Sequence, residues 1–445
     1  MSKEKEYKEL KEWYRKSFSE FESKMNGHSK SFLHQFRTDS IAEFDKYNFP
    51  TLKNEDWKYT SVSPILKQNF KPALTLADNK VSEEVVQKNL LKDFDCNVLV
   101  FVNGIFNKEF SKVDCLPEGV VIDSLENVLS TKPELVKDKI TKLSKIENSF
   151  NALNGAFAMD GLFVYLPKGK VVEKPVQVLY LNGIENENVL ASPRNLIIAE
   201  ANSQVSIISS YMGEDGLKYF TNVVTEVYTE ENAIVDLYKI QDESHEAYHI
   251  EKLDAYQKSK SVFSHYSLSF GGAIVRNDFN DIMDDENIES HFYGLYLAND
   301  DQHVDHHTFV DHAKPNCESN ELYKGILDGH SRGVFNGKIM VREDAQKTNA
   351  YQSNKTVLLS DDARIDTKPQ LEIFADDVKC SHGATVGHLD DEAYFYIRSR
   401  GVPDHLAKSM LIRAFANDVV EKIKIEELRE QINHMIFEHL HQVEI

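Results

Sequence analysis

The chain has 445 residues, a hydrophobic fraction of 41% and a formal net charge of −21. This length exceeds a single ordinary core, so we expect two or three structural regions. The acidic balance argues against nucleic acid or an anionic membrane as the main partner, because both are bound by basic surfaces.

The cellular compartment is predicted from the first residues and the cysteines. The start of the sequence forms no apolar leader, and no apolar run approaches the length of a membrane span. Four widely scattered cysteines without any Cys-x-x-Cys spacing indicate a reducing compartment instead of a disulfide framework. We therefore expect a cytoplasmic protein.

The amino-terminal region shows helical periodicity. Its first apolar stripe recurs every three or four residues and comprises Tyr7, Leu10, Tyr14, Phe18, Phe21 and Met25. We interpret this stripe as an intramolecular packing face and Asn26-Gly27 as the end of the helix. A second helical pattern runs from Phe32 to Pro50, and residues 54–60 are predicted to form an ordered loop.

Strand-like periodicity begins near residue 97. Residues 98–102, the dipeptide Asn103-Gly104 and residues 105–106 give a strong signal for a two-residue β-hairpin. A mixed segment with helical character extends to about residue 158. From 162 to 373, short β-rich runs follow one another without intervening helices.

Similar acidic segments separate these runs. Each segment begins with two acidic residues, continues with small, apolar or polar residues and leads into a strand. The segments are residues 230–233, 285–288, 343–346, 361–364 and 376–379. The last three are separated by 18 and 15 residues. Weak repetition of short strands favours a solenoid of the β-helix type, whose coils bury themselves against their neighbours. A β-sandwich is the alternative, although its hairpin turns should be richer in Asn-Gly and Gly-Pro.

The carboxy-terminal region is predicted to be helical again. An acidic start at residues 390–392 and a stop at Gly401 delimit one helix. Two amphipathic patterns follow, over residues 406–423 and 428–440. Such helices can cap the end of a solenoid or present a face to another protein, and capping is favoured on physical grounds.

These patterns predict a mainly β chain of three domains. We place a mostly helical or mixed domain at 1–158, a β-helix core at 159–388 and a helical domain at 389–445.

Residues 379–401 are the most distinctive stretch, with Cys380 and His382 two residues apart in a glycine-rich turn. Thiolate sulfur and imidazole nitrogen suit iron, zinc or copper(I), and a thiolate can also carry sulfide. The alternative is a small buried cysteine beside a hydrogen-bonded histidine. Gly383 and Gly387 permit tight backbone geometry, and on an extended segment both side chains would point the same way. Two ligands cannot complete a four-ligand site, so a second chain would supply the others.

Residues 303–312 contain four histidines and two aspartates. In an extended strand His303 and His307 lie on one face and His306 and His312 on the other, which disfavours a single metal site. We interpret the segment as polar turns and an exposed strand face of the solenoid, with metal binding as the minor alternative.

Familiar catalytic and phosphate-binding motifs are missing from the sequence. It has no Gly-x-x-x-x-Gly-Lys-Ser/Thr loop, no Gly-x-Gly-x-x-Gly after a strand, no His-Glu-x-x-His and no Gly-x-Ser-x-Gly. The glycines at 325, 329, 333 and 337 are predicted to serve tight coil corners.

The stretch 379–401 closely resembles the carboxy-terminal signature of SufD, within the SufB/SufD family of the Suf iron–sulfur cluster assembly machinery. The SufB branch carries a Glu-His dyad where this chain has Cys380-Ser381-His382-Gly383, so the string is SufD-like. His388, where relatives often have Gln, is a departure to which we attach no function. Further similar segments are 303–308, 312–317, 321–329, 333–339, 354–360 and 369–373.

The resemblance implies a right-handed parallel β-helix between two helical domains. The core would pair with a SufB-like subunit, and the carboxy-terminal helices would dock a SufC-like ABC ATPase. We assign that docking to a helix face that carries Leu406, Met410, Leu411 and Phe415. ATP would be used by that partner, whose dimerisation would move the two cores and open a site between them.

The same resemblance implies the site residues. His382 matches a histidine implicated in iron handling, and Cys380 matches a cysteine near the same interface. A nascent iron–sulfur cluster would form there from iron and from sulfur delivered through the complex, while binding of a reduced flavin is left open. The chain itself would be a scaffold and not an enzyme.

Two alternatives remain open from the sequence. The chain could take the SufB role as a cluster-bearing homodimer. On fold grounds alone it could be a β-helix carbohydrate-active enzyme, although fold analogy is a weak argument.

Overall fold

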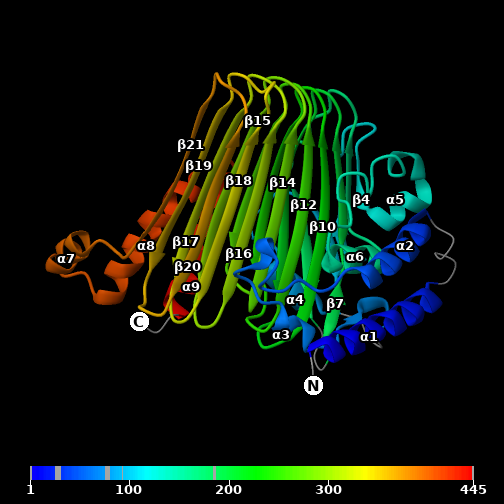
Figure 1. Cartoon of the computed structure of the whole chain (residues 1–445), viewed down its shortest axis with the longest axis horizontal. Helices are drawn as coiled ribbons and strands as arrows, with labels where there is room; N and C mark the ends of the chain where they lie inside the picture. The colour runs from blue at the N-terminus through cyan, green and yellow to red at the C-terminus, as the bar shows by residue number, and fades with distance from the viewer. Residues whose placement is uncertain (1–2, 26–31, 76–80, 93, 184–186, 443–445) are drawn as a thin grey trace.

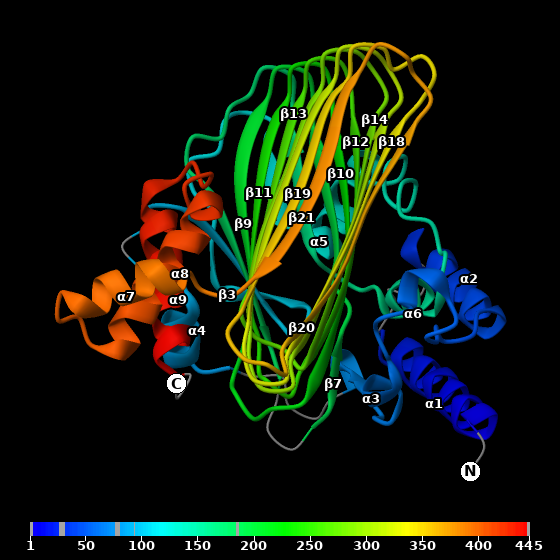
Figure 2. The same cartoon turned by 60° about the vertical axis from the view of Figure 1, so that its left-hand side comes forward.

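The computed structural model of the chain describes residues 3–25, 32–75, 81–92, 94–183 and 187–442. Two β-sheets face each other and wind into one long solenoid, with helices on both flanks (Figure 1, Figure 2). Successive turns of the solenoid stack in parallel, which excludes the β-sandwich. The predicted mainly β solenoid with helices at both ends of the sequence is confirmed.

The first sheet has 11 strands within the described residues. In chain order they are β1 (Lys71–Pro72), β4 (Val121–Ser124), β5 (Leu162–Leu166), β7 (Val189–Ala191), β8 (Arg194–Ala199), β10 (Tyr219–Thr229), β12 (Tyr248–Gln257), β14 (Ile274–Met283), β16 (His303–His312), β18 (Arg332–Val341) and β20 (Arg364–Ile373). Their main path is β20-β18-β16-β14-β12-β10-β8-β5-β4, and β7 pairs with β1 and β10. Among the described strands of this first sheet, only β4 and β5 pair antiparallel.

The second sheet has 10 strands within the same described residues. They are β2 (Asn97–Val102), β3 (Ile105–Lys112), β6 (Val176–Asn182), β9 (Gln204–Gly213), β11 (Ile234–Asp242), β13 (Val262–Ser269), β15 (Glu289–Ala298), β17 (Glu318–Leu327), β19 (Asn349–Leu358) and β21 (Lys379–Gly387). Their order is β21-β19-β17-β15-β13-β11-β9-β6-β2-β3. From β8 onward the chain alternates between the sheets, so one coil contributes one strand to each.

The predicted hairpin is confirmed. β2 and β3 pair antiparallel around Asn103-Gly104, with Val102 opposite Ile105. Asn103 and Gly104 have φ of 50° and 80°, as a two-residue turn that matches strand twist requires.

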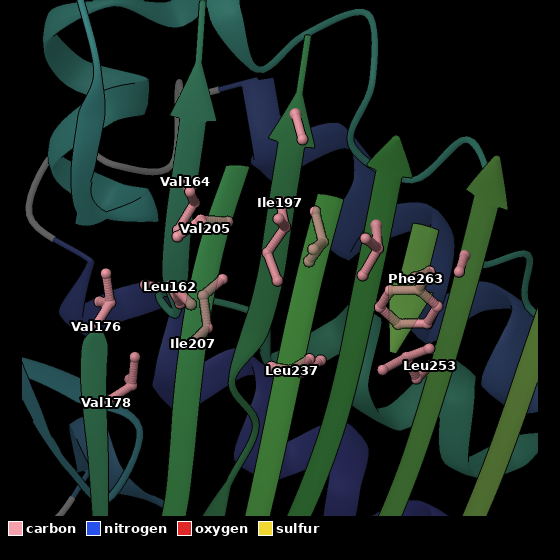
Figure 3. Packing of buried hydrophobic residues seen from close by; sticks show 14 of the residues in the cluster. Leu162, Val164, Val176, Val178, Ile197, Val205, Ile207, Leu237, Leu253 and Phe263 are labelled. Atoms are coloured by element: carbon pink, nitrogen blue, oxygen red, sulfur yellow. The ribbon is translucent and has the colours of Figure 1, made fainter. Parts of the chain in front are cut away.

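Apolar side chains fill the space between the sheets over the first coils. Leu162 and Val164 of β5 lie among Val205 and Ile207 of β9, all at most 1% exposed (Figure 3). Burying one such side chain is worth about 1.5–3 kcal/mol, so stacking of successive coils supplies the driving force of the fold. The same cluster continues along the axis to Phe335.

The acidic segments predicted as punctuation lie at the corners between strands. Asn232 and Asn287 have φ of 57° and 60°, a left-handed conformation that asparagine adopts more readily than most residues. The Asn232 N–H donates to the Ser259 carbonyl of the next coil at 2.9 Å. Register pairs such as His303 with Arg332 give about 30 residues per coil, within the range of repeat architectures. The spacings of 18 and 15 residues between the last three acidic segments therefore each correspond to about half a coil.

The prediction that four glycines serve corners is correct only for Gly329, which has φ of 59° between β17 and β18. Gly325, Gly333 and Gly337 lie inside strands. A Cβ on Gly325 would sit 2.4 Å from Tyr296 Cζ, and a Cβ on Gly337 would sit 2.4 Å from Gln352 Nε2. These glycines make room for large interior side chains.

Most of the amino-terminal helices, among them α1, α2, α3 and α6, lie on one flank of the solenoid (Figure 2). They are α1 (Lys3–Lys24), α2 (Phe32–Lys46), α3 (Ser63–Leu66), α4 (Glu83–Asn89), α5 (Leu125–Thr131) and α6 (Ser149–Phe157), with 3₁₀ turns η2 (Glu55–Trp57), η3 (Ala73–Thr75) and η4 (Pro133–Leu135). Leu10, Tyr14 and Phe21 are buried, which confirms the intramolecular packing face. The Tyr7 side chain and the predicted stop at Asn26-Gly27 lie outside the described residues. α4 packs instead near the carboxy-terminal helices.

The carboxy-terminal helices are α7 (Asp391–Ser399), α8 (Asp404–Val420) and α9 (Glu426–Gln442). The expectation that they cap the solenoid is wrong. Ile412, Ile432 and Ile436 are buried against the outer face of the second sheet, where Tyr266 Oη donates to the Lys422 carbonyl at 2.8 Å. An amphipathic pattern in the sequence indicates that a helix has an apolar face, but it does not indicate which surface that face covers. No helix in the described part of the chain is long and apolar enough to span a membrane.

The domain boundaries at 158 and 388 stay a prediction. β2 and β3 precede residue 158 but belong to the second sheet, so the first region and the solenoid share a core.

Candidate functional site at the open end of the solenoid

The last coil is open. Across the described residues, β20 and β21 each hydrogen-bond to a strand on one side only, through β18 and β19 (Figure 2). Ile373, Phe374 and Val386 are 40%, 63% and 49% exposed around this end, whereas every residue of β10 is buried. Unpaired strand edges beside exposed apolar side chains are typical of a surface that another chain covers.

Cys380 and His382 lie in β21, opposite Ala350 and Gln352 of β19. Those two neighbours are buried, so the alternation of the strand turns both functional side chains toward the interior of the open coil. The predicted shared orientation is therefore confirmed. The predicted glycine-rich turn is wrong, because the pair belongs to an extended strand.

Gly383 and Gly387 have no left-handed φ, and a Cβ on either would meet nothing within 4 Å among the described residues. Neither the backbone conformation nor the packing within this chain requires glycine there. The space next to both glycines, on the outward face of the edge strand β21, is therefore open.

Cys380 is half-buried and packs against a small cluster of buried residues that includes Ala350 and Ala375. Burial raises the pKa of Cys380, and a backbone hydrogen bond from Ala350 offsets part of that effect. The thiol therefore stays protonated at neutral pH in the isolated chain. A metal or positive charge brought by another molecule would be needed to make it a thiolate.

The imidazole of His382 is exposed at the mouth of the coil. Among the described residues, no three His, Cys, Asp or Glu side chains lie close enough to hold a metal ion. Cys380 and His382 thus offer at most part of a ligand set.

The histidine-rich segment 303–312 forms β16, and its predicted split between two faces is confirmed. The predicted exposed face is wrong, because residues 54–60 cover it. His303 Nε2 lies 2.8 Å from Thr60 Oγ1, and Arg276 donates to Asp305 at 2.8 Å. Trp57 lies over the same guanidinium at 3.8 Å. This face anchors the amino-terminal loop.

The interior face of β16 holds the other two histidines. Burial lowers the pKa of His306 to about 3 and that of His312 to about 4, so both are neutral at physiological pH. His312 Nε2 lies 2.8 Å from Ser319 Oγ, and His306 packs between Tyr296 and Tyr323. They are structural side chains of the core.

A buried charged network inside the solenoid escaped the sequence analysis. Lys239 Nζ lies 2.5 Å from Glu251 Oε2 and 2.8 Å from His249 Nε2, and His249 Nδ1 lies 2.7 Å from Glu243. Burial alone would raise the pKa of Glu251, but Lys239 and His249 hold it well below its usual value. The available signal was the presence of charged residues such as Lys239 and Glu251 within the β-rich stretch of the sequence.

The predicted docking face on α8 is only partly exposed. Met410 is 52% exposed, while Leu406 and Leu411 are half-buried. Phe415 packs on the sheet, where Lys324 Nζ lies 4.4 Å from its ring and donates to its carbonyl at 2.6 Å.

Comparison with known proteins decides the family. Residues 182–415 match the model described as "SUF system FeS cluster assembly, SufBD core domain", and residues 8–178 match "SufBD protein N-terminal region". The chain belongs to the SufBD family. This SufBD protein is therefore an iron–sulfur cluster assembly protein of a family of scaffold-type components.

Its relatives include SufD proteins. It is 30% identical to a SufBD family protein of Synechocystis over 93% of this chain and 92% of that one. It is 30% identical to the Escherichia coli iron–sulfur cluster assembly protein SufD, over 88% of this SufBD chain and 89% of the relative. The Bacillus subtilis SufD is 28% identical over 71% and 72% of the two chains.

Proposed function

We propose that this chain is a non-catalytic, SufD-type scaffold subunit that pairs through its open end with a SufB-type subunit. The single observation behind this proposal is the uncovered last coil, which presents two free strand edges and the His382 imidazole together. A partner strand laid against β20 or β21 satisfies their unpaired backbone groups, and exposed apolar side chains such as Phe374 are buried in the process.

Iron and sulfide are the cargo of this interface. The His382 ring nitrogen binds iron, and Cys380 offers sulfur once the metal or the partner lowers its pKa. The partner supplies the remaining ligands. The open mouth of the coil agrees with this division of the ligand set, because His382 is exposed there while Cys380 lies just inside.

ATP hydrolysis belongs to a SufC-type ATPase that docks on the carboxy-terminal helices. Phe395 and Tyr396 of α7 and Met410 of α8 are 73%, 59% and 52% exposed, which leaves apolar surface for a partner. Deleting residues 404–445 is a poor test, because α8 and α9 bury Ile412 and Ile432 against the sheet. Phe395→Asp with Met410→Asp tests the docking without removing that core.

The decisive experiment co-expresses the chain with SufB-type and SufC-type subunits and measures iron and acid-labile sulfide in the purified complex. His382→Ala should lower both while the complex still assembles. His388→Ala is the matched control, since His388 is also exposed and bonds through Nδ1 to the Leu358 carbonyl at 3.0 Å. Equal iron content in the His382 and His388 variants would contradict the role of His382.

The same open end also matches a second copy of this chain, as the SufB-like homodimer requires. Sedimentation of the isolated chain and its absorption spectrum after reconstitution distinguish the two assemblies. A cluster-bearing homodimer would refute the scaffold role.

A further inference from the structure

Gln352 of β19 lies one coil inside His382, as its direct register partner. Its side chain is 2% exposed, and its amide oxygen Oε1 has no hydrogen-bond partner among the described residues. An unpaired buried carbonyl is costly, by about 1–3 kcal/mol, so a donor is expected to reach it in the working protein.

A hydrogen bond to the next coil inward fixes the orientation of the Gln352 amide. Gln352 Nε2 donates to Glu321 Oε1 at 3.1 Å, and Thr308 Oγ1 donates to Glu321 Oε2 at 2.5 Å. Glu321 is the register partner of Gln352 one coil further in. Because Gln352 Nε2 donates to Glu321 Oε1, the amide oxygen of Gln352 is turned away from that carboxylate oxygen. The coil on the other side of Gln352 is that of β21.

The same orientation holds in either protonation state of Glu321. An ionised carboxylate accepts through both oxygens. A protonated one can place its proton on Oε2, toward the Thr308 hydroxyl, which can then accept. Glu321 Oε1 therefore stays an acceptor for the Gln352 amide group.

The opposite sheet provides the space for this amide. Gly337 of β18 faces Gln352 across the interior, and a Cβ there would approach Nε2 to 2.4 Å and Cδ to 2.7 Å. Gly337 has no positive φ, so its lack of a side chain serves packing and not backbone conformation. The Gln352 amide is thus held by its hydrogen bond to Glu321 and by close packing against Gly337.

We propose that Gln352 is the positioning residue of His382: its amide oxygen accepts the imidazole N–H, which leaves the other ring nitrogen free to bind iron. This inference rests on the proposed function of His382. Side chains opposite each other on parallel strands are about 5 Å apart, so rotation of the exposed imidazole can bring a ring N–H to Gln352 Oε1.

This contact would determine which ring nitrogen of His382 carries the proton and which one binds the metal. Neutral imidazole carries one N–H and one lone pair, and only the lone pair binds a metal. A hydrogen bond to one ring nitrogen selects the tautomer and orients the ring, and losing such a partner typically weakens metal binding by about 10- to 100-fold. The Gln352 carbonyl fills this role from inside the coil, so the free nitrogen faces the interface.

Asn354 gives a matched comparison two residues further along β19. It is also buried, it donates to Thr367 Oγ1 at 3.0 Å, and its own carbonyl has no partner among the described residues. Its register partner is Ala384, whose side chain has no hydrogen-bond donor. Asn354→Leu therefore also removes a buried amide and its hydrogen bond, but at a position that does not face the imidazole.

The test reads the His382 tautomer directly in the full chain by ring ¹H–¹⁵N NMR at pH 8, with His382→Ala to assign the signal. Gln352→Met should shift the ring from one tautomer to a mixture, and Asn354→Leu should not. The double exchange of Glu321→Gln with Gln352→Glu reverses this hydrogen bond, because the amide at position 321 then donates to the carboxylate at position 352. The other oxygen of that carboxylate can accept the imidazole N–H, so the exchange should restore the single tautomer. Iron retention in the assembled complex should fall about 10- to 100-fold in Gln352→Met and recover in the exchange variant.

An unchanged tautomer in Gln352→Met, or equal loss in Asn354→Leu, overturns the inference. If the tautomer shifts but His382→Ala retains iron, the positioning contact stands and the proposed function of His382 fails. If His382→Ala loses iron while Gln352→Met changes neither tautomer nor iron, the proposed function stands and the positioning role fails.

Discussion

Replacing Glu321 with Gln should remove a pH dependence of stability that this carboxyl imposes on the last coils. Burial raises the pKa of Glu321 from 4.5 to about 7, against hydrogen bonds from Thr308 and Gln352 that lower it. Between these two values the folded chain holds a proton that the unfolded chain has released. Stability therefore falls as pH rises from about 4.5 through about 7. From pH 5 to pH 8 the loss from this group is about 2.5 kcal/mol, at 1.36 kcal/mol per pKa unit.

The assay is hydrogen exchange of the β17 and β19 amides at several pH values, because a long repeat array need not unfold in one step. The opening free energy of Glu321→Gln relative to the wild type should rise by about 2.5 kcal/mol between pH 5 and pH 8. Glu318→Gln, an exposed position of the same strand, should show no such change. If wild type and Glu321→Gln keep a constant difference across this pH range, Glu321 is ionised in the folded chain and the reasoning is wrong.

Three further outcomes follow from the packing. Lys324→Met removes a donor to an α8 carbonyl and should destabilise the contact of α8 with the sheet by about 1–3 kcal/mol, measured by exchange of the α8 amides. Gly325→Ala forces a Cβ against Tyr296 and should lower the free energy of unfolding by about 1–3 kcal/mol in urea titrations. Burial raises the pKa of Cys317 to about 11, so at pH 8 a thiol reagent should modify the exposed Cys115 first and Cys317 only after unfolding, as peptide mapping would show.

Local signals predicted the local structure of this chain well. Asn103-Gly104 specified a hairpin because left-handed φ at two consecutive positions is a property of those residue types. The period of two along an extended segment correctly predicted that Cys380 and His382 share one side, although the segment itself was expected to be a turn. The parallel β-helix itself rested on weak repetition and on resemblance to the SufB/SufD family.

The failures concern contacts between distant parts of the sequence. The outer face of β16 was expected to be exposed, but Thr60 reaches it from 243 residues away. Gly337 was assigned to a corner, since nothing in the sequence shows that a glutamine from the opposite sheet needs its space. For the same reason the pairing of Gln352 with Glu321 could not be foreseen, because the register of the coils decides it.

The open coil also has a consequence for synthesis on the ribosome. Each coil of the solenoid is briefly the last one made, and until the next is added it shows the same free edges as β20 and β21. A partner that recognised only backbone groups would capture unfinished nascent chains as readily as complete ones. For the proposed partner, discrimination then depends on side chains of the final coil, in residues 364–373 and 379–387.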